Sequence, residues 1–237
     1  MLGLTHNTYI KSRGLNGAFI NKYFLSFNGT DESVQIDALG NDMETNAGTI
    51  SVWVILNDTS GSATVIRCIA DSNNQIFIFR HGSSDEIRFV YKAAGTTSIA
   101  AFDASSFNHT EWTHFAMTWS AASDELKGFI NGDQVGGTQS SLGTFSGDIA
   151  SVDLGQNGSD GAFLKGSLDE VSVWKSVIDI DTLYNNGVRR NVKHAGLDNT
   201  KLVGYYQFEE GNGTSTKDSS GNANHGTLVN TPTWSSF

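Results

Sequence analysis

The chain has 237 residues, a formal net charge of −10 and 38% hydrophobic residues, and this length suits one large all-β domain. The acidic balance argues against general binding to nucleic acid, which requires a basic surface. No apolar run approaches the roughly 20 residues of a membrane helix, so we expect no membrane insertion. A single cysteine, Cys68, excludes an intramolecular disulfide, and its apolar surroundings predict a buried thiol.

The first 23 residues differ from the rest of the chain. They contain Lys11, Arg13 and Lys22 but no acidic residue, and many of their other side chains are apolar. Two interpretations stay open: a flexible terminal arm, or an anchor that docks on a partner. The segment has no continuous apolar stretch, so we expect no standard secretory signal. We therefore divide the chain into an N-terminal arm, residues 1–23, and a domain, residues 24–237.

From residue 24 onward, short strand patterns alternate with polar, glycine-rich turns, which predicts an all-β fold. Strands are expected at residues 24–27, 33–36, 49–56, 63–70, 75–80, 86–92, 97–102, 113–119, 126–132 and 150–155.

Two of these strands show how the faces are used. In the strand at residues 86–92, Ile87, Phe89 and Tyr91 alternate with polar or smaller residues and are expected to share one face. In the second, residues 112–119, both faces carry large side chains, which suggests a central position with one face in the core and the other against loops, a second layer or a ligand. His114 lies on that second face and is expected to be a packed residue rather than a metal ligand.

One helix is predicted at residues 179–187. Asp179 or Asp181 would cap its start, Leu183 and Tyr184 would anchor it, and Gly187 would end it. The segment after residue 200 reads as strand, polar loop, strand. It is expected to complete the same domain, because roughly 40 residues cannot bury an independent core.

Five motifs, in this order, resemble the laminin-G-like (LamG) jelly-roll domains of the concanavalin A-like lectin and glucanase superfamily. They are Phe27-Asn28-Gly29, Thr49-Ile50-Ser51-Val52-Trp53-Val54, Trp112-Thr113-His114-Phe115-Ala116, Phe129-Ile130-Asn131-Gly132 and Gly166-Ser167-Leu168-Asp169-Glu170-Val171.

The resemblance covers about residues 24–234 and implies a two-sheet antiparallel jelly-roll sandwich. The stretch from His114 is also similar to the pentraxin signature, but Ala116 stands where that signature has Cys. Two motifs that usually come early, at residues 208–211 and 218–221, come last here. We therefore expect a permuted strand order, and a truncated second repeat is the competing interpretation.

The resemblance further implies a structural calcium ion that ties the first strand to the last. Calcium takes several oxygen ligands, both carboxylates and carbonyls. Carried over by motif, the ligands would be the carbonyl of Gly29 and the carboxylate of Asp169, with Asp31 as an added carboxylate and Glu210 as a further candidate. The alternative is that Asp169 only accepts backbone N–H bonds at a strand end.

Glycoside hydrolysis is the enzymatic alternative within this superfamily. Family glucanases place their carboxylates on alternate positions of one strand, so that they share a face. No such spacing occurs here, so we expect no enzymatic activity. The acidic residues instead form adjacent pairs whose side chains are expected to point to opposite faces: Asp85-Glu86, Asp124-Glu125 and Asp169-Glu170.

We expect a non-enzymatic structural or adhesion protein, namely a phage virion decoration or fibre-type subunit with glycan recognition, on a virion or an extracellular surface. The cationic arm before an acidic body, and an extracellular type of fold without disulfide or export signal, favour this assignment. Residues 1–23 would contact other assembly proteins, and homo-oligomers are an open expectation. The alternative is a free-standing carbohydrate-binding lectin module, and a glycoside hydrolase is the second alternative. Candidate glycan-binding loops are residues 82–86, 105–111 and 155–163.

Overall fold

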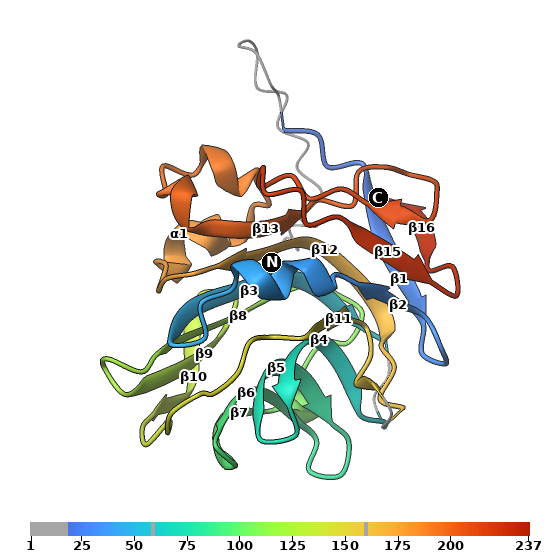
Figure 1. Ribbon diagram of the computed structural model, residues 1–237. Helices are drawn as coiled ribbons and strands as arrows, with labels where there is room; N and C mark the ends of the chain where they lie inside the picture. Colours follow the sequence, from blue (N-terminus) through green and yellow to red (C-terminus); the bar gives the residue numbers. More distant parts are fainter. Residues whose placement is uncertain (1–18, 58–59, 159–160) are drawn as a thin grey trace.

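The computed structural model describes residues 19–57, 60–158 and 161–237. Its strands form two eight-stranded antiparallel sheets that pack face to face (Figure 1), and this confirms the predicted sandwich. Sheet A has the order β10–β9–β8–β3–β12–β1–β16, with β13 also paired to β12; sheet B has the order β14–β15–β2–β11–β4–β5–β6–β7.

The strands of sheet A are, in this order, Asp133–Gln139 (β10), Glu125–Ile130 (β9), Thr113–Ser120 (β8), Ala47–Leu56 (β3), Lys165–Trp174 (β12), Tyr23–Asn28 (β1), Thr233–Ser236 (β16) and Leu202–Tyr206 (β13). The strands of sheet B are Ser215–Thr216 (β14), Gly226–Val229 (β15), Ser33–Gln35 (β2), Ser151–Leu154 (β11), Ala63–Asp71 (β4), Asn74–His81 (β5), Glu86–Ala93 (β6) and Thr96–Asp103 (β7).

All ten strands expected up to residue 155 are present, within one or two residues at their ends. The main core lies between the sheets and contains the inward residues of every long strand, including Ile87, Phe89 and Tyr91 as predicted. Cys68 is fully buried in this core, and burial raises the pKa of its thiol. The sequence did not reveal β10, whose residues are mostly exposed and include two adjacent glycines.

The outer face of sheet A is covered by a second hydrophobic layer. The segment that follows β12 folds back over this face, so that Trp174, Leu183 and Tyr205 pack against Ala116 of β8. In Figure 1 this segment lies at the top of the molecule, with β4–β7 of sheet B at the bottom. The covering segment is built from α1 (Ile180–Tyr184) and short 3₁₀ helices at Asn185–Gly187, Val192–His194 and Asn199–Lys201; further 3₁₀ helices lie at Asp37–Asp42 and Ala104–Ser106.

Helix α1 begins where the sequence predicts. Asp179 is its N-cap, and its carboxylate accepts a hydrogen bond from the Thr182 amide at 3.2 Å. Leu183 is buried against the outer face of sheet A. The α-helix ends earlier than expected, because Asn185 already adopts the left-handed conformation at φ 51°; Gly187 ends the 3₁₀ turn that follows.

The strands after residue 200 belong to both sheets. β13 pairs with β12, β15 pairs with β2, and β16 pairs with β1, so that Trp234 lies opposite Leu25. The Trp234 ring packs against the main core and its Nε1 donates to the carbonyl of Gly213 at 3.0 Å. The C-terminal segment therefore supplies neighbours to both N-terminal strands and completes the sandwich, and a permuted strand order stays a prediction.

No helix within the described ranges is both long and apolar enough to cross a membrane.

A chain truncated after Asn199 is expected to lose cooperative folding. The truncation removes β13–β16 and the buried side chains of Tyr206 and Phe208 from the main core, and it leaves β2 and β12 with open edges. Thermal unfolding followed by circular dichroism tests this, with Asn212→Ala in an exposed loop as the control. An unchanged unfolding midpoint for the truncated chain would show that these strands are accessory.

Candidate functional site

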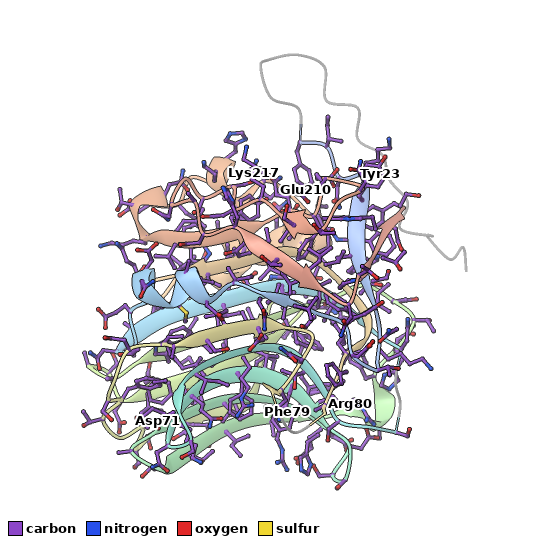
Figure 2. The ribbon with its side chains drawn as sticks, turned by 45° about the vertical axis from the view of Figure 1, so that its right-hand side comes forward. Tyr23, Asp71, Phe79, Arg80, Glu210 and Lys217 are labelled. Carbon is purple, nitrogen blue, oxygen red and sulfur yellow. The ribbon has the colours of Figure 1, made fainter. Side chains whose placement is uncertain are left out.

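The outer face of sheet B carries a row of partly exposed rings along β5. Phe77, Phe79 and His81 alternate with Ile76 and Ile78, which point inward and are fully buried. The ring centroids of Phe77 and Phe79 are 5.2 Å apart, and those of Phe79 and His81 are 5.8 Å apart. Figure 2 places Phe79 on the opposite side of the molecule from Tyr23, the first residue of β1. A partly exposed row of mutually tilted rings therefore runs along β5, between β4 and β6.

Hydrogen-bonded polar side chains lie at one end of this row. His81 Nδ1 is 2.8 Å from Ser84 Oγ, and Ser84 Oγ donates to Glu86 Oε2 at 2.7 Å. Arg88 Nε donates to the same carboxylate oxygen at 2.8 Å. The Ser84 hydroxyl and then Arg88 lower the pKa of Glu86, so this carboxylate is ionised at neutral pH and held in one orientation.

Arg67 lies on the other side of the row. It is paired with Phe77 across β4 and β5, so the two side chains share a face. Its Nη2 donates to Gln75 Oε1 at 3.0 Å, and its Nη1 donates to the carbonyl of Asn157 at 2.8 Å. The guanidinium thus joins β5 to the loop after β11. We call Phe77, Phe79, His81, Arg67, Gln75, Ser84, Glu86 and Arg88 together the platform.

The three loops suggested as glycan-binding rims lie at one end of the sandwich, next to the platform. The antiparallel register brings the ends of β5, β7 and β11 to this end. Residues 82–86 supply Ser84 and Glu86 to the platform, and the loop at 155–163 reaches it through Asn157. Residues 159 and 160 lie outside the described residues.

A buried arginine holds this end of the sandwich together. Arg80 points inward from β5 and is 1% exposed. It donates to the carbonyl of Gly61 and to Asp85 Oδ1, so it links the loop after β3 to the turn after β5. Figure 2 shows Arg80 beside Phe79, the two side chains leaving adjacent positions of the same strand. The loop end beside the platform is therefore fixed from inside.

The structure does not bring the predicted calcium ligands together. Leu25 pairs with Leu168, so Asp169 lies beside the start of β1, whereas Gly29 follows its end, roughly 17 Å away at ~3.3 Å per residue. Asp31 Oδ1 accepts a hydrogen bond from Asn28 Nδ2 at 3.0 Å within the turn after β1. In the described part of the chain, no group of three or more His, Cys, Asp or Glu side chains is arranged to hold a metal ion. Calcium binding remains a prediction.

Glu210 lies elsewhere as well. Its Oε1 accepts the Lys217 amide at 2.8 Å, and Figure 2 shows both residues on the same side of the molecule as Tyr23. Since Tyr23 begins β1 and Gly29 follows the end of that strand, Glu210 is also separated from the turn that holds Asp31.

Asp169 instead forms a buried ionic cluster with Glu170 and Arg189 on the outer face of sheet A. Arg189 Nε lies 3.3 Å from Asp169 Oδ2, and Asn21 Nδ2 donates to the same oxygen at 3.1 Å. Tyr205 donates its hydroxyl hydrogen to Glu170 Oε2. Burial raises the pKa of Asp169 to about 7, and burial together with the Asp169 carboxylate raises that of Glu170.

The expectation that Asp169 and Glu170 point to opposite faces was wrong. Glu170 adopts a left-handed backbone conformation at φ 50°, and the pairing of β12 with β3 shifts register between Asp169 and Ser172. This β-bulge interrupts the alternation of side chains. Both carboxylates therefore contact the layer that covers sheet A, and each is less than 4% exposed.

Three aromatic rings surround the guanidinium of Arg189. Its Cζ is 4.9 Å from the ring centroid of Trp53, 4.4 Å from that of Trp112 and 4.7 Å from that of Phe237. Cation–π contacts of this kind strengthen as water is excluded. The cluster therefore fastens the covering segment and the C-terminal residue to sheet A.

A family comparison identifies the superfamily of this chain. The family model Laminin_G_3, described as concanavalin A-like lectin/glucanases superfamily, matches residues 28–181, more than half of the sequence. The chain belongs to the concanavalin A-like lectin/glucanases superfamily. No curated protein sequence matches it.

Several solved structures share the fold of this chain at low sequence identity. A candidate carbohydrate-binding protein from Bacteroides ovatus aligns with a TM-score of 0.65 and 15% identity, over 91% of this chain and 60% of that protein. The NanB sialidase of Streptococcus pneumoniae aligns with a TM-score of 0.56 and 18% identity, over 68% of this chain and 27% of the sialidase. A pentraxin from Limulus polyphemus aligns with a TM-score of 0.53 and 16% identity, over 74% of this chain and 88% of the pentraxin. The chain thus spans less than two thirds of the first two proteins.

His114 is a buried residue of β8 on the outer face of sheet A, packed as predicted. It has no exposed surface, and its Nε2 is 2.7 Å from Ser51 Oγ. Burial lowers its pKa to about 3 from an ordinary value of 6.5. Between these pH values the unfolded chain binds a proton here that the folded chain does not, so this side chain makes the fold less stable as the pH falls.

Replacing His114 by Gln, which keeps a hydrogen-bonding group beside Ser51, is expected to remove this dependence. Between pH 6 and pH 4, the free energy of unfolding of the wild type should fall about 1.4 kcal/mol per pH unit more steeply than that of H114Q. Urea unfolding at several pH values measures the difference, and Thr118→Ala on the same face should run parallel to the wild type. If the free energy of unfolding of H114Q instead fell with pH in parallel with that of the wild type, His114 would bind its proton equally well in the folded and the unfolded chain.

Proposed function

We propose that this chain is a carbohydrate-binding module without catalytic activity, and that the platform on sheet B is its binding face. The observation that supports this most is the partly exposed row of Phe77 and Phe79 on the outer face of β5. The apolar C–H face of a sugar ring packs on aromatic rings, and its hydroxyl groups require nearby hydrogen-bond partners of fixed geometry.

The platform supplies those partners on both sides of the rings. Glu86 is an acceptor that Ser84 and Arg88 hold in place, and on the other side the guanidinium of Arg67 lies beside Phe77, held there by the buried Gln75. Because these side chains already bind one another, little conformational entropy is lost when a ligand binds. The fold-level likeness to the candidate carbohydrate-binding protein of Bacteroides ovatus also supports this proposal.

The carboxylates are poorly placed for glycoside hydrolysis. Hydrolysis requires a pair of accessible carboxyl groups, one of which is protonated. Asp169 and Glu170 have raised pKa values but are buried beneath the covering segment. Glu86 is accessible, but its pKa is lowered, which does not suit a general acid. These features favour binding over catalysis.

The comparisons favour the free-standing lectin module over the phage virion subunit. Carbohydrate binding is what the printed description of the Bacteroides ovatus protein names, and none of the three structures compared above is described as a virion component. Location on a virion or an extracellular surface, and assembly through residues 1–23, remain predictions; residues 1–18 of that arm lie outside the described residues.

Replacing Phe77 and Phe79 together by Ala is expected to weaken glycan binding about tenfold or more, because the stacking surface is lost. The wild type is first screened on a glycan array with and without calcium, and the best ligand is then titrated by calorimetry. Phe129→Ala, a partly buried aromatic on the outer face of sheet A, is the matched control and should bind as the wild type does. Equal affinity of F77A/F79A and wild type would contradict the assignment of the face, and an array without any bound glycan would contradict the function.

A further inference from the structure

A groove of about 380 Å³ lies on the outer face of sheet A, away from the platform. One side is formed by the outward residues of β8 and β9, and the other by residues 177–181, which lead into α1. Phe129 of β9 and Val177 are its apolar walls; Val177 is 54% exposed. The groove is thus separate from the proposed glycan-binding face.

The lining of the groove is acidic. Among the lining residues, the one cation, Lys127, is already bound to Glu125, with Nζ 2.7 Å from Oε2. Three further carboxylates, Asp133, Asp179 and Asp181, are exposed and line the groove. A ligand that fits this groove therefore combines positive charge with apolar side chains.

The most exposed large apolar side chains of the described residues also lie on the side of sheet A. Ile20 precedes Asn21, which binds Asp169; Val188 precedes Arg189 of the same cluster; and Phe237 stacks with Arg189. Together with Val177 in the groove, these are the large hydrophobic residues that are most exposed within the described ranges. Apolar side chains gathered on one side indicate a surface that contacts protein rather than sugar.

We propose that this groove is the docking site for residues 1–18 of this chain. That segment contains Lys11 and Arg13 and no acidic residue, so its charge complements the groove. It also contains Leu2, Leu4, Tyr9, Ile10 and Leu15, apolar side chains of a size that Phe129 and Val177 can pack against. A second copy's groove face is a poorer occupant, because two acidic surfaces repel each other.

The chain is long enough for this contact. Asn21 is held against β12 on the outer face of sheet A, by its hydrogen bond to Asp169. From β12 the groove at β8 and β9 lies two to three strands away on the same face, about 10–15 Å across the sheet at ~4.8 Å per strand. It also lies about 13–20 Å further along β8 at ~3.3 Å per residue, because Asp169 is level with His114 and the groove with Thr118–Ser120. Eighteen extended residues span up to about 60 Å, so the segment reaches the groove of its own chain or of a neighbouring copy.

The test uses the full-length chain with a photo-crosslinking amino acid in place of Tyr9. Mass spectrometry is expected to find crosslinks to peptides that contain Phe129–Gln134 or Val177–Asp181. The double charge reversal Asp133→Lys/Asp181→Lys should lower their yield about tenfold. The matched control Glu111→Lys/Asp148→Lys reverses two exposed acids outside the groove and should leave the yield unchanged.

Groove crosslinks in the monomer show docking within one chain, and groove crosslinks between two copies show docking in a neighbour; both support the proposal. Crosslinks only to other surfaces, no crosslinks, or a yield that the groove reversal does not change would overturn it. Glycan binding is measured on the same variants and should be unaffected by D133K/D181K, because the platform lies on the other sheet.

Discussion

The ion pair between Arg189 and Asp169 is the contact on which the covered side of this sandwich depends. Asp169 is fully buried, the Arg189 side chain is 17% exposed, and three aromatic rings enclose the guanidinium. Loss of one partner of such a buried pair leaves an uncompensated charge and typically costs about 3–5 kcal/mol. Asn21 joins the same carboxylate and Phe237 the same guanidinium, so the two ends of the described chain and the segment after β12 are fastened at one place.

This fastening makes the two outer faces of the sandwich different. On sheet A, Trp174, Leu183 and Tyr205 form a second hydrophobic layer, and polar groups such as His114 are sealed beneath it. Within residues 19–57, 60–158 and 161–237, no such layer covers β4–β7 of sheet B, and Phe77 and Phe79 remain partly exposed. The same fold thereby provides one face that is closed by its own chain and one that is available to a ligand.

Alternation of apolar and polar residues was sufficient to predict the long strands up to residue 155, although β12 was not among the strands expected, and the capping residue Asp179 marked the start of α1. It did not reveal β10, since Gly136 and Gly137 break the pattern and the strand lies at an edge. It also misled the interpretation of Asp169 and Glu170, because the bulge at Glu170 is a backbone feature that adjacent acidic letters do not disclose. The predicted calcium ligands failed to meet for a related reason: motif order does not give strand register.

The platform was not identified from the sequence, although the sequence contains a pattern that could have indicated it. The strand at residues 75–80 has large apolar residues at every second position on both faces, so the pattern alone does not say whether Ile76 and Ile78 or Phe77 and Phe79 point to the core. The register resolves this, because Phe77 and Phe79 are paired with Arg67 and Arg88 on neighbouring strands. The arginines on the two neighbouring strands, Arg67 and Arg88, were the signal in the sequence that Phe77 and Phe79 lie on the outer face of the sheet.

Mapping of amide chemical shifts during a glycan titration tests the division between the two faces most directly. Shifts concentrated on β4, β5 and β6 around Phe77, Phe79 and Glu86, with the groove around Phe129 unchanged, are the predicted result. Shifts concentrated on the covered side around α1 and β9, with β5 unchanged, would contradict it and would place the binding site on sheet A.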